Sequence, residues 1–140
     1  MADPKLLLPK VEKLCGVFIE KCRLNGISVI ITQTYRTIQE QDALYAQGRT
    51  KKGRIVTNAR GGQSFHNFRV AFDFVILEKG KPDWNVRNKK WQQAGKIAQS
   101  IGLEWGGAWR DFVDLPHCQF TAGHTLRDFQ KGIINKKKFL

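Results

Sequence analysis

The stretch that decides the fold is SFHNFRVAFDFVIL, residues 64–77. From Val70 to Leu77 every residue except Asp73 is apolar. A short run that is apolar on both faces is typical of a strand in the interior of a sheet. A lone carboxylate in such a strand is costly to bury unless it is paired or bound to a metal. The stretch therefore predicts a central strand that carries a functional aspartate.

Amphipathic helices are predicted on both sides of this strand in the sequence. Apolar residues recur at helical spacing over residues 7–22, and Gly26 supplies a stop. The same spacing recurs at residues 91–101, where Gly102 closes the helix. A further helix is expected over residues 37–47, with Ile38, Leu44 and Tyr45 facing inward, and a last one over residues 126–134.

Two shorter apolar segments predict additional strands. Residues 27–32 are β-branched and apolar, which favours a short buried strand, and residues 117–120 favour another. Residues 49–64 are charged and lack periodicity, so we expect a long loop, which in a compact domain is usually functional. Helices interleaved with a few short strands indicate an α+β fold with a small, mostly antiparallel sheet flanked by helices.

The chain has the size of one domain and carries a large positive charge. Its 140 residues contain no linker or repeat, so residues 1–140 are predicted to form a single catalytic domain. A net charge of +12 implies a polyanionic partner, but no zinc-finger or RNP-like motif indicates specific nucleic-acid binding. No stretch predicts a signal peptide or a membrane span, which favours synthesis in the cytoplasm.

Two of the three histidines lie in patterns that suit a metal site. His66 and His117 offer imidazoles, Asp73 offers a carboxylate, and this ligand set is common for catalytic zinc, with a fourth position left open for water. His66 and Asp73 are seven residues apart and would face opposite ways on one strand. We therefore place His66 in the loop before the strand, Asp73 on it and His117 on a neighbouring strand, in a cleft.

Asp114 lies three residues before His117, in the segment Asp114-Leu115-Pro116-His117. Pro116 biases the residue before it toward an extended conformation, so this is not the helical pairing of an H-E-x-x-H metalloprotease. A turn here would leave Asp114 free to act as the general base for the attacking water.

These motifs also resemble a known family. The pattern Ser64-x-His66-x-x-Arg69-x-Ala71-x-Asp73 resembles the SxHxxGxAxD motif of the D-alanyl-D-alanine carboxypeptidase-like zinc peptidases. The closer match is to phage endolysins that cut the L-alanyl-D-glutamate bond of peptidoglycan. Further segments that look like that group are residues 34–36 (TYR), 40–50 (EQDALYAQGRT), 102–107 (GLEWGG) and 114–119 (DLPHCQ).

The resemblance implies a role for each residue of the pattern. His66, Asp73 and His117 are the implied ligands of Zn²⁺, and Asp114 is the implied catalytic base. Arg36 is implied to stabilise the oxyanion, which is reasonable because a fixed cation favours the negative charge that develops on the scissile carbonyl. Ser64, the first residue of this motif, is expected to position substrate or a ligand by hydrogen bonding.

Two positions depart from the family pattern. Arg69 stands where the motif usually has glycine, and Ala108 stands where the closest relatives are expected to have aspartate. Both leave the ligand set intact. They put the local backbone and the fine substrate specificity in question.

The function predicted from the sequence is a zinc metallopeptidase that hydrolyses the L-alanyl-D-glutamate bond of bacterial peptidoglycan, as an endolysin that causes host cell lysis. The expected protein is a monomer, made in the host bacterial cytoplasm and acting on the cell wall after release. Its positive charge is expected to hold it on anionic cell-envelope polymers, an attraction that salt weakens.

Other readings stay open at this point. The same chemistry on the D-alanyl-D-alanine bond would give a carboxypeptidase or dipeptidase, and a non-catalytic module would bind the wall or another polyanion without zinc. A thiol-protease dyad of Cys118 and His124 is conceivable but has no evident third group. Cys15 and Cys22 are expected in the core. The four tryptophans could stack on sugars, but in a domain this small they are more often core residues, so we expect them there.

Overall fold

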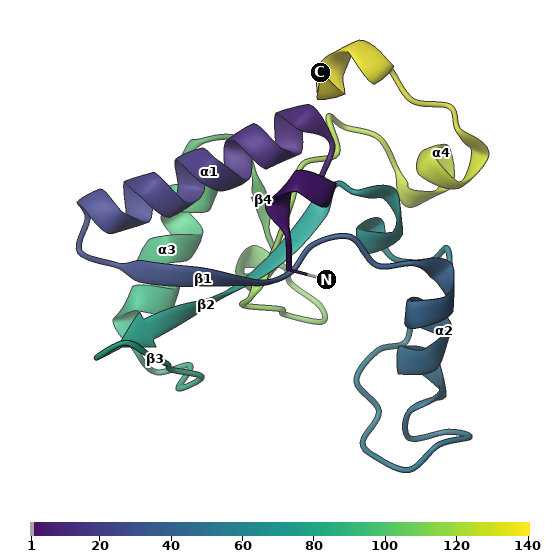
Figure 1. Cartoon of the computed structure of the whole chain (residues 1–140), viewed down its shortest axis with the longest axis horizontal. Helices are drawn as coiled ribbons and strands as arrows, with labels where there is room; N and C mark the ends of the chain where they lie inside the picture. Colours follow the sequence, from purple (N-terminus) through teal and green to yellow (C-terminus); the bar gives the residue numbers. More distant parts are fainter. Residues whose placement is uncertain (1) are drawn as a thin grey trace.

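A computed structural model describes residues 2–140 of the chain and has an α+β architecture (Figure 1). The sheet has five strands in the order β1-β2-β5-β4, with β3 beside β2, and every pairing is antiparallel. The strands are β1 (Ser28–Gln33), β2 (Ala71–Glu78), β3 (Lys81–Pro82), β4 (Glu104–Trp105) and β5 (His117–Gln119). The expected fold class, an α+β domain with a mostly antiparallel sheet, is confirmed.

Two long helices pack on the sheet. Helices α1 and α3 contact each other, α1 also contacts β1, and α3 contacts β4. The helices are α1 (Pro9–Leu24), α2 (Ile38–Ala46), α3 (Lys89–Ser100) and α4 (Leu126–Lys131), with short 3-10 helices η1 (Pro4–Leu6), η2 (Phe65–Phe68), η3 (Gly106–Ala108) and η4 (Lys136–Phe139). Helix α2 and the loop that follows it extend away from the sheet as a lobe (Figure 1). In the part of the chain that the structure describes, no helix is both long and apolar enough to span a membrane.

The core forms around β2, as its sequence predicts. Phe18 of α1 lies between Phe72 and Phe74 of β2, with ring centroids 5.8 and 4.9 Å away, and Phe74 in turn packs against Trp91 of α3. Cys15 and Cys22 are fully buried in this core, as expected. Burial raises the pKa of both thiols to about 12, so they remain protonated.

Several local expectations are wrong. Strand β1 is an edge strand, not a buried one, and Ile30 on it is 43% exposed. In α2 the buried residue is Gln41, whereas Ile38 is exposed, because the helix stands on the lobe and not against the sheet. Helix α4 ends at Lys131, before Gly132 in the left-handed region, and the two-residue strands β3 and β4 were not predicted.

The tryptophans divide into two pairs. Trp91 and Trp105 are buried, as expected, but Trp84 is 57% exposed and Trp109 is 36% exposed. The expectation that all four lie in the core is therefore wrong. Trp84 still stacks on Trp91, with ring centroids 6.0 Å apart, whereas Trp109 lies at the cleft described below.

The backbone explains why glycine is usual at the position of Arg69. Its φ of 63° lies in the left-handed region, where a side chain is disfavoured. Here the arginine side chain compensates: Nη1 donates a hydrogen bond of 3.0 Å to the carbonyl of Leu6, and the guanidinium lies 3.8 Å from the ring centroid of Tyr35. The position tolerates a side chain because that side chain ties η1 to η2.

We expect the two truncations of Arg69 to differ in stability. Arg69→Ala removes the contacts and keeps the strained backbone, whereas Arg69→Gly removes the contacts and relieves the strain. Arg69→Gly should therefore be the more stable of the two by roughly 1 kcal/mol. Chemical denaturation of both variants and the parent protein measures this difference, and equal stability of the two variants would show that the backbone is not strained there.

Candidate metal centre and its cleft

Three side chains that are far apart in the sequence meet at the centre of the sheet. Asp73 lies on β2 directly opposite His117 on β5, as Cα partners of the antiparallel ladder. His66 lies in η2, the short helix before β2, whose start is capped by Ser64 accepting a hydrogen bond from the backbone N–H of His66. The predicted placement of all three residues, in the segment before the strand, on the strand and on its neighbour, agrees with the structure.

The three donor atoms have the spacing of a metal site. Nε2 of His66 and Nδ1 of His117 each lie 3.2 Å from Oδ1 of Asp73, and all three atoms lie within 4.8 Å of one another. Ligands about 2.0–2.1 Å from a tetrahedral ion lie roughly 3.3 Å apart. The two separations from Asp73 match this value, so the donor set suits a divalent metal ion.

The hydrogen bond made by Nδ1 of His66 determines which nitrogen of this ring faces the metal site. Nδ1 lies 2.7 Å from the backbone carbonyl of Thr34, which can only accept a hydrogen bond. Nδ1 therefore carries the proton. In the neutral imidazole, Nε2 then presents a lone pair to Asp73.

A longer chain of hydrogen bonds fixes His117. Gln119 donates from Nε2 to the carboxylate of Glu104 at 2.6 Å, so its amide oxygen turns toward His117 and lies 2.7 Å from Nε2. Nε2 of His117 must then carry the proton that Gln119 accepts, and Nδ1 presents a lone pair to Asp73. Such outer partners orient metal ligands and fix their tautomers.

The two neutral imidazoles thus point lone pairs at a carboxylate oxygen. This arrangement is repulsive unless a metal cation lies between them or the imidazoles take up protons. Burial alone would raise the pKa of Asp73, but where the ring nitrogens that face it carry protons, hydrogen bonds from His117 and His66 hold that pKa well below its usual range. Burial alone would lower the pKa of His117, but the hydrogen bond and charge of Asp73 raise it. Both shifts report the same need for positive charge.

Asp114 is held at the edge of this centre by the β4–η3 segment. Its backbone N–H donates to the carbonyl of Gly106 at 3.0 Å, and Trp105 donates from Nε1 to the carbonyl of the following Leu115 at 2.8 Å. A Cβ on Gly106 would collide with the carbonyl oxygen of Asp114, so only glycine allows this approach. Burial, and secondly the charge of Asp73, raise the pKa of the Asp114 carboxyl, which suits a proton acceptor.

Arg36 reaches the cleft from the segment before α2. Its Nη1 donates to Oε1 of Gln41 at 2.7 Å, and Gln41 donates in turn to the carbonyl of Ala59 at 2.8 Å. Burial lowers the pKa of the guanidinium, opposed by the charges of Asp73, Glu40 and Asp114. Its Nε is buried and has no hydrogen-bond partner among the described residues, so this polar atom is unsatisfied in the protein without a ligand.

The predicted site residues line one hollow of about 450 Å³. Arg36, Ser64, His66, Asp73, Asp114 and His117 all contribute to its wall. Ala108, the other departure from the family pattern, is exposed at the end of η3 and is not part of that wall.

Sequence reasoning missed the residues that support the site. Thr34, Gln41, Glu104 and Gln119 orient His66, Arg36 and His117, yet each is an ordinary polar residue in the sequence. All four lie in the segments that resemble the family, but the resemblance implied no role for them. For Gln119 the spacing is a further signal, since it lies two residues after His117 and alternate residues of a strand share a face.

Cys118 is fully buried, and burial raises the pKa of its thiol well above the usual value. His124 bonds elsewhere, since its Nδ1 lies 3.5 Å from Asp128 and its Nε2 accepts from the backbone N–H of Asn135. A nucleophilic thiolate needs a lowered pKa and access to substrate. The structure therefore gives no support to a Cys118/His124 dyad.

Comparison with known proteins identifies the family. A family model described as D-alanyl-D-alanine carboxypeptidase, of the M15 peptidases, matches residues 57–120. The peptidoglycan L-alanyl-D-glutamate endopeptidase CwlK of Bacillus subtilis (strain 168) is 42% identical over 127 residues, which cover 85% of this chain and 76% of CwlK. The chain belongs to the M15 peptidase family. The residues matched by the model include Ser64, the three metal-site residues and Asp114.

A second curated relative and two solved structures are also similar to the chain. The L-alanyl-D-glutamate peptidase of Listeria phage A118 is 37% identical over 134 residues, and the chain spans 44% of that longer protein. Among solved structures, the Serratia marcescens L-Ala D-Glu endopeptidase ChiX has a TM-score of 0.64 at 18% identity, covering 91% of this chain and 86% of that one. The LdcB LD-carboxypeptidase has a TM-score of 0.66 at 13% identity, covering 95% and 67%. These structural likenesses show a shared fold.

We expect Gln119→Ala to weaken metal binding by roughly 10–100-fold, because His117 loses the acceptor that fixes its tautomer. Glu104→Ala should weaken metal binding less, since Glu104 contacts Gln119 and not His117 itself. Competition with a chromophoric chelator measures the affinity for a divalent metal directly, without substrate. Gln99→Ala, at an exposed glutamine of α3, is the matched control. Equal affinities of the Gln119 and Gln99 variants would contradict the proposed orientation of His117.

Proposed function

We propose that this protein is a zinc endopeptidase that hydrolyses the L-alanyl-D-glutamate bond of peptidoglycan stem peptides. The observation that carries the proposal is the cleft itself, where His66, Asp73 and His117 converge beside the carboxylate of Asp114 and the guanidinium of Arg36. The similarity to CwlK over most of both chains supports the choice of bond. Two imidazoles and a carboxylate support zinc as the metal.

The side chains divide the chemistry between them. A bound zinc ion supplies a Lewis acid that polarises the scissile carbonyl and lowers the pKa of water to about 7. Asp114 takes the proton of the attacking water and returns it to the departing amine. The guanidinium of Arg36, in the wall of the same hollow, stabilises the negative charge that develops on the carbonyl oxygen. Ser64 caps η2 and so positions His66, and its place in the cleft wall also allows contact with substrate.

We further propose a role in phage-encoded host lysis. The similarity to the peptidase of Listeria phage A118 supports it. In this role the protein is made in the host bacterial cytoplasm and acts, as a monomer, on the cell wall after release. These proposals on origin, location and oligomeric state rest on the family and not on the geometry of the site.

Digestion of purified peptidoglycan tests the bond and the metal together. Mass spectrometry should find new N-termini at D-glutamate, and a chelator should remove them until zinc is restored. Asp114→Asn should lower the rate by about 10²–10⁴-fold, because the cleft loses its proton acceptor while the metal ligands remain. Unchanged metal affinity of this variant serves as the control.

Release of D-alanine instead of new D-glutamate N-termini would favour a second function. The matching family model is described as a D-alanyl-D-alanine carboxypeptidase, and the same residues would serve that reaction. No cleavage by folded, zinc-loaded protein would favour a non-catalytic wall-binding module.

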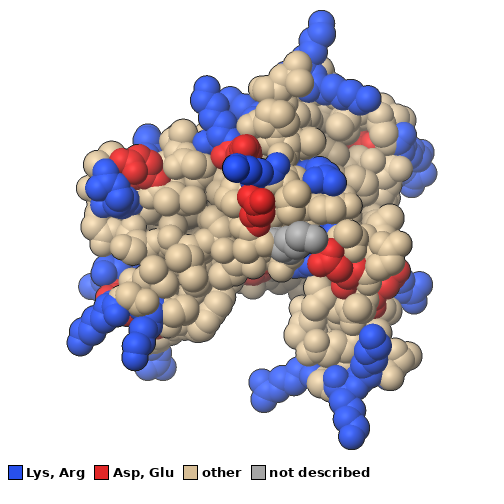
Figure 2. Space-filling model, viewed as in Figure 1, with Lys and Arg blue, Asp and Glu red and all other residues tan. Residues whose placement is uncertain are grey.

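The positive charge supports attachment to anionic envelope polymers. Between Asp42 and Asp73 the chain has no acidic residue, and its basic residues there are Arg49, Lys51, Lys52, Arg54, Arg60 and Arg69. Figure 2 shows Lys and Arg side chains gathered at the end of the α2 lobe, beside the notch between this lobe and the sheet. A cationic surface next to the cleft would hold the enzyme where its substrate lies.

We expect the triple variant Lys51→Gln, Lys52→Gln, Arg54→Gln to bind purified walls more weakly and with less dependence on salt. The matched control removes the same charge elsewhere, at Lys136, Lys137 and Lys138 of η4, and should have less effect. A sedimentation assay over a range of NaCl concentrations measures both. Wall binding that does not change with salt in the parent protein would contradict the proposal.

A further inference from the structure

A second, larger hollow of about 770 Å³ opens beside the metal centre. It shares part of its wall with the hollow that holds the metal-site residues, and the residues common to both are Val56, Thr57, Ala59, Gln63, Trp109 and Asp114. The two hollows therefore form one continuous cleft. The metal centre occupies one end, and the function described above leaves the other end unassigned.

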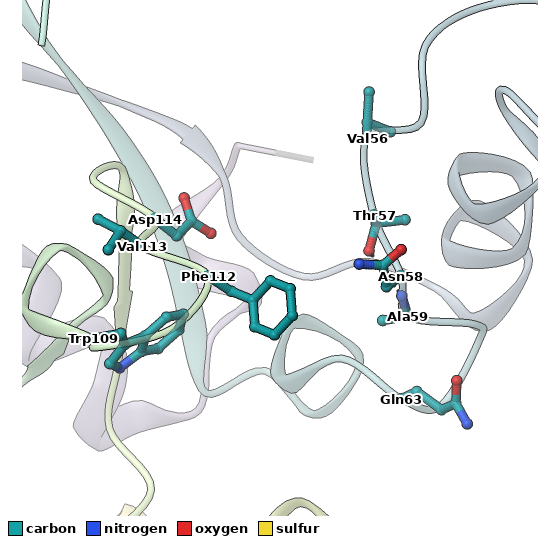
Figure 3. A pocket seen from close by; sticks show the side chains of 9 residues that line it. All are labelled: Val56, Thr57, Asn58, Ala59, Gln63, Trp109, Phe112, Val113 and Asp114. Carbon is teal, nitrogen blue, oxygen red and sulfur yellow. Dashed lines mark hydrogen bonds between the residues drawn. The ribbon is translucent and has the colours of Figure 1, made fainter.

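Two loops face each other across this second hollow (Figure 3). Residues 56–63 form one wall and residues 109–114 form the other. The ring of Phe112 projects from its loop into the gap toward the opposite wall (Figure 3). Phe112 is 84% exposed and has a φ of 54°, in the left-handed region. A bulky residue held there is uncommon, and such positions concentrate at functional sites.

The lining is apolar and aromatic, with neutral hydrogen-bonding groups. Trp109, Phe112 and Val113 supply apolar surface on one wall, and Thr57 and Asn58 supply neutral polar groups on the other. Among the described residues of this lining, Asp114 alone is ionisable, and it lies toward the metal. Such a surface suits an uncharged ligand with an apolar face and polar edges, as a sugar ring with its hydroxyl and acetamido groups has.

The position of the hollow relative to the metal suits the same ligand, provided that the proposed function holds. The L-alanyl-D-glutamate bond is the first peptide bond of the stem, so one alanine and a lactyl group separate it from the glycan. Since a residue spans at most about 3.6 Å, the sugar must lie close to the metal. Trp109 already packs against the metal-site residue His117, with ring centroids 5.2 Å apart.

We propose that this hollow binds the N-acetylated sugar to which the stem peptide is attached, with Trp109 and Phe112 as its stacking surfaces. The cleft then recognises the glycan end of the stem, and the sugar places the first peptide bond over the metal. A peptidase for the distal D-alanyl-D-alanine end would have no use for such a subsite.

Two substrates with the same peptide test this proposal, one free and one attached to its sugar. The parent protein should cleave the sugar-linked peptide with the lower KM, and Phe112→Ala should reduce that preference roughly tenfold. Trp84→Ala is the matched control, because Trp84 is an exposed aromatic residue outside both hollows, and this variant should keep the preference.

Binding of the peptide-free N-acetylated disaccharide gives a readout without catalysis. NMR titration of the parent protein should shift the signals of Trp109 and Phe112, and Phe112→Ala should weaken the binding. Cleavage with no preference and no disaccharide shift would overturn the proposal, as would a preference that follows peptide length instead of the sugar. If neither substrate is cleaved at L-alanyl-D-glutamate, the proposed function fails, and the titration still decides whether the hollow binds a sugar.

Discussion

The antiparallel pairing of β2 with β5 is the constraint on which the site depends. It sets Asp73 directly opposite His117, and the 3-10 turn before β2 brings His66 back to the same point. Three acceptor atoms are thereby forced together in the protein interior, where their mutual repulsion is costly unless a cation is present. The aromatic core anchors β2 through Phe72 and Phe74, on the face opposite Asp73. The core provides the rigidity that a preorganised metal site requires.

Hydrogen bonds from surrounding residues orient the side chains of the site. The carbonyl of Thr34 fixes the tautomer of His66, and the Glu104–Gln119 pair fixes that of His117. Gln41 holds Arg36 at the wall of the cleft, and the buried Nε of Arg36 has no hydrogen-bond partner among the described residues. Asp114 is positioned by backbone contacts with the Gly106 segment, so its carboxylate is not occupied in holding its own loop. These side chains are thus fixed mainly by hydrogen bonds that do not use the atoms facing the cleft.

The departures from the family pattern have different physical meanings. At Arg69 the backbone keeps the left-handed conformation that glycine adopts easily, and contacts with Leu6 and Tyr35 offset its cost. Ala108 is exposed outside the wall of the metal-bearing hollow, so nothing in its surroundings alters the ligand set. The loops at residues 56–63 and 109–114 line the part of the cleft where a change of side chain can alter substrate specificity.

The sequence by itself determined the central strand, the two packed helices and the cysteines of the core, and it indicated His66, Asp73 and His117 as candidate metal ligands. The elements follow from local periodicity, Asp73 was indicated by a carboxylate in an apolar strand, and the two histidines were indicated by the ligand set and the family resemblance. Tertiary structure alone decided the edge position of β1, the burial of Gln41 and the exposure of Trp109. It also decided the support of His117 by Glu104, fifteen residues from Gln119 in the sequence. Burial and hydrogen-bond partnership depend on which distant segments become neighbours, and no local pattern in the chain encodes that.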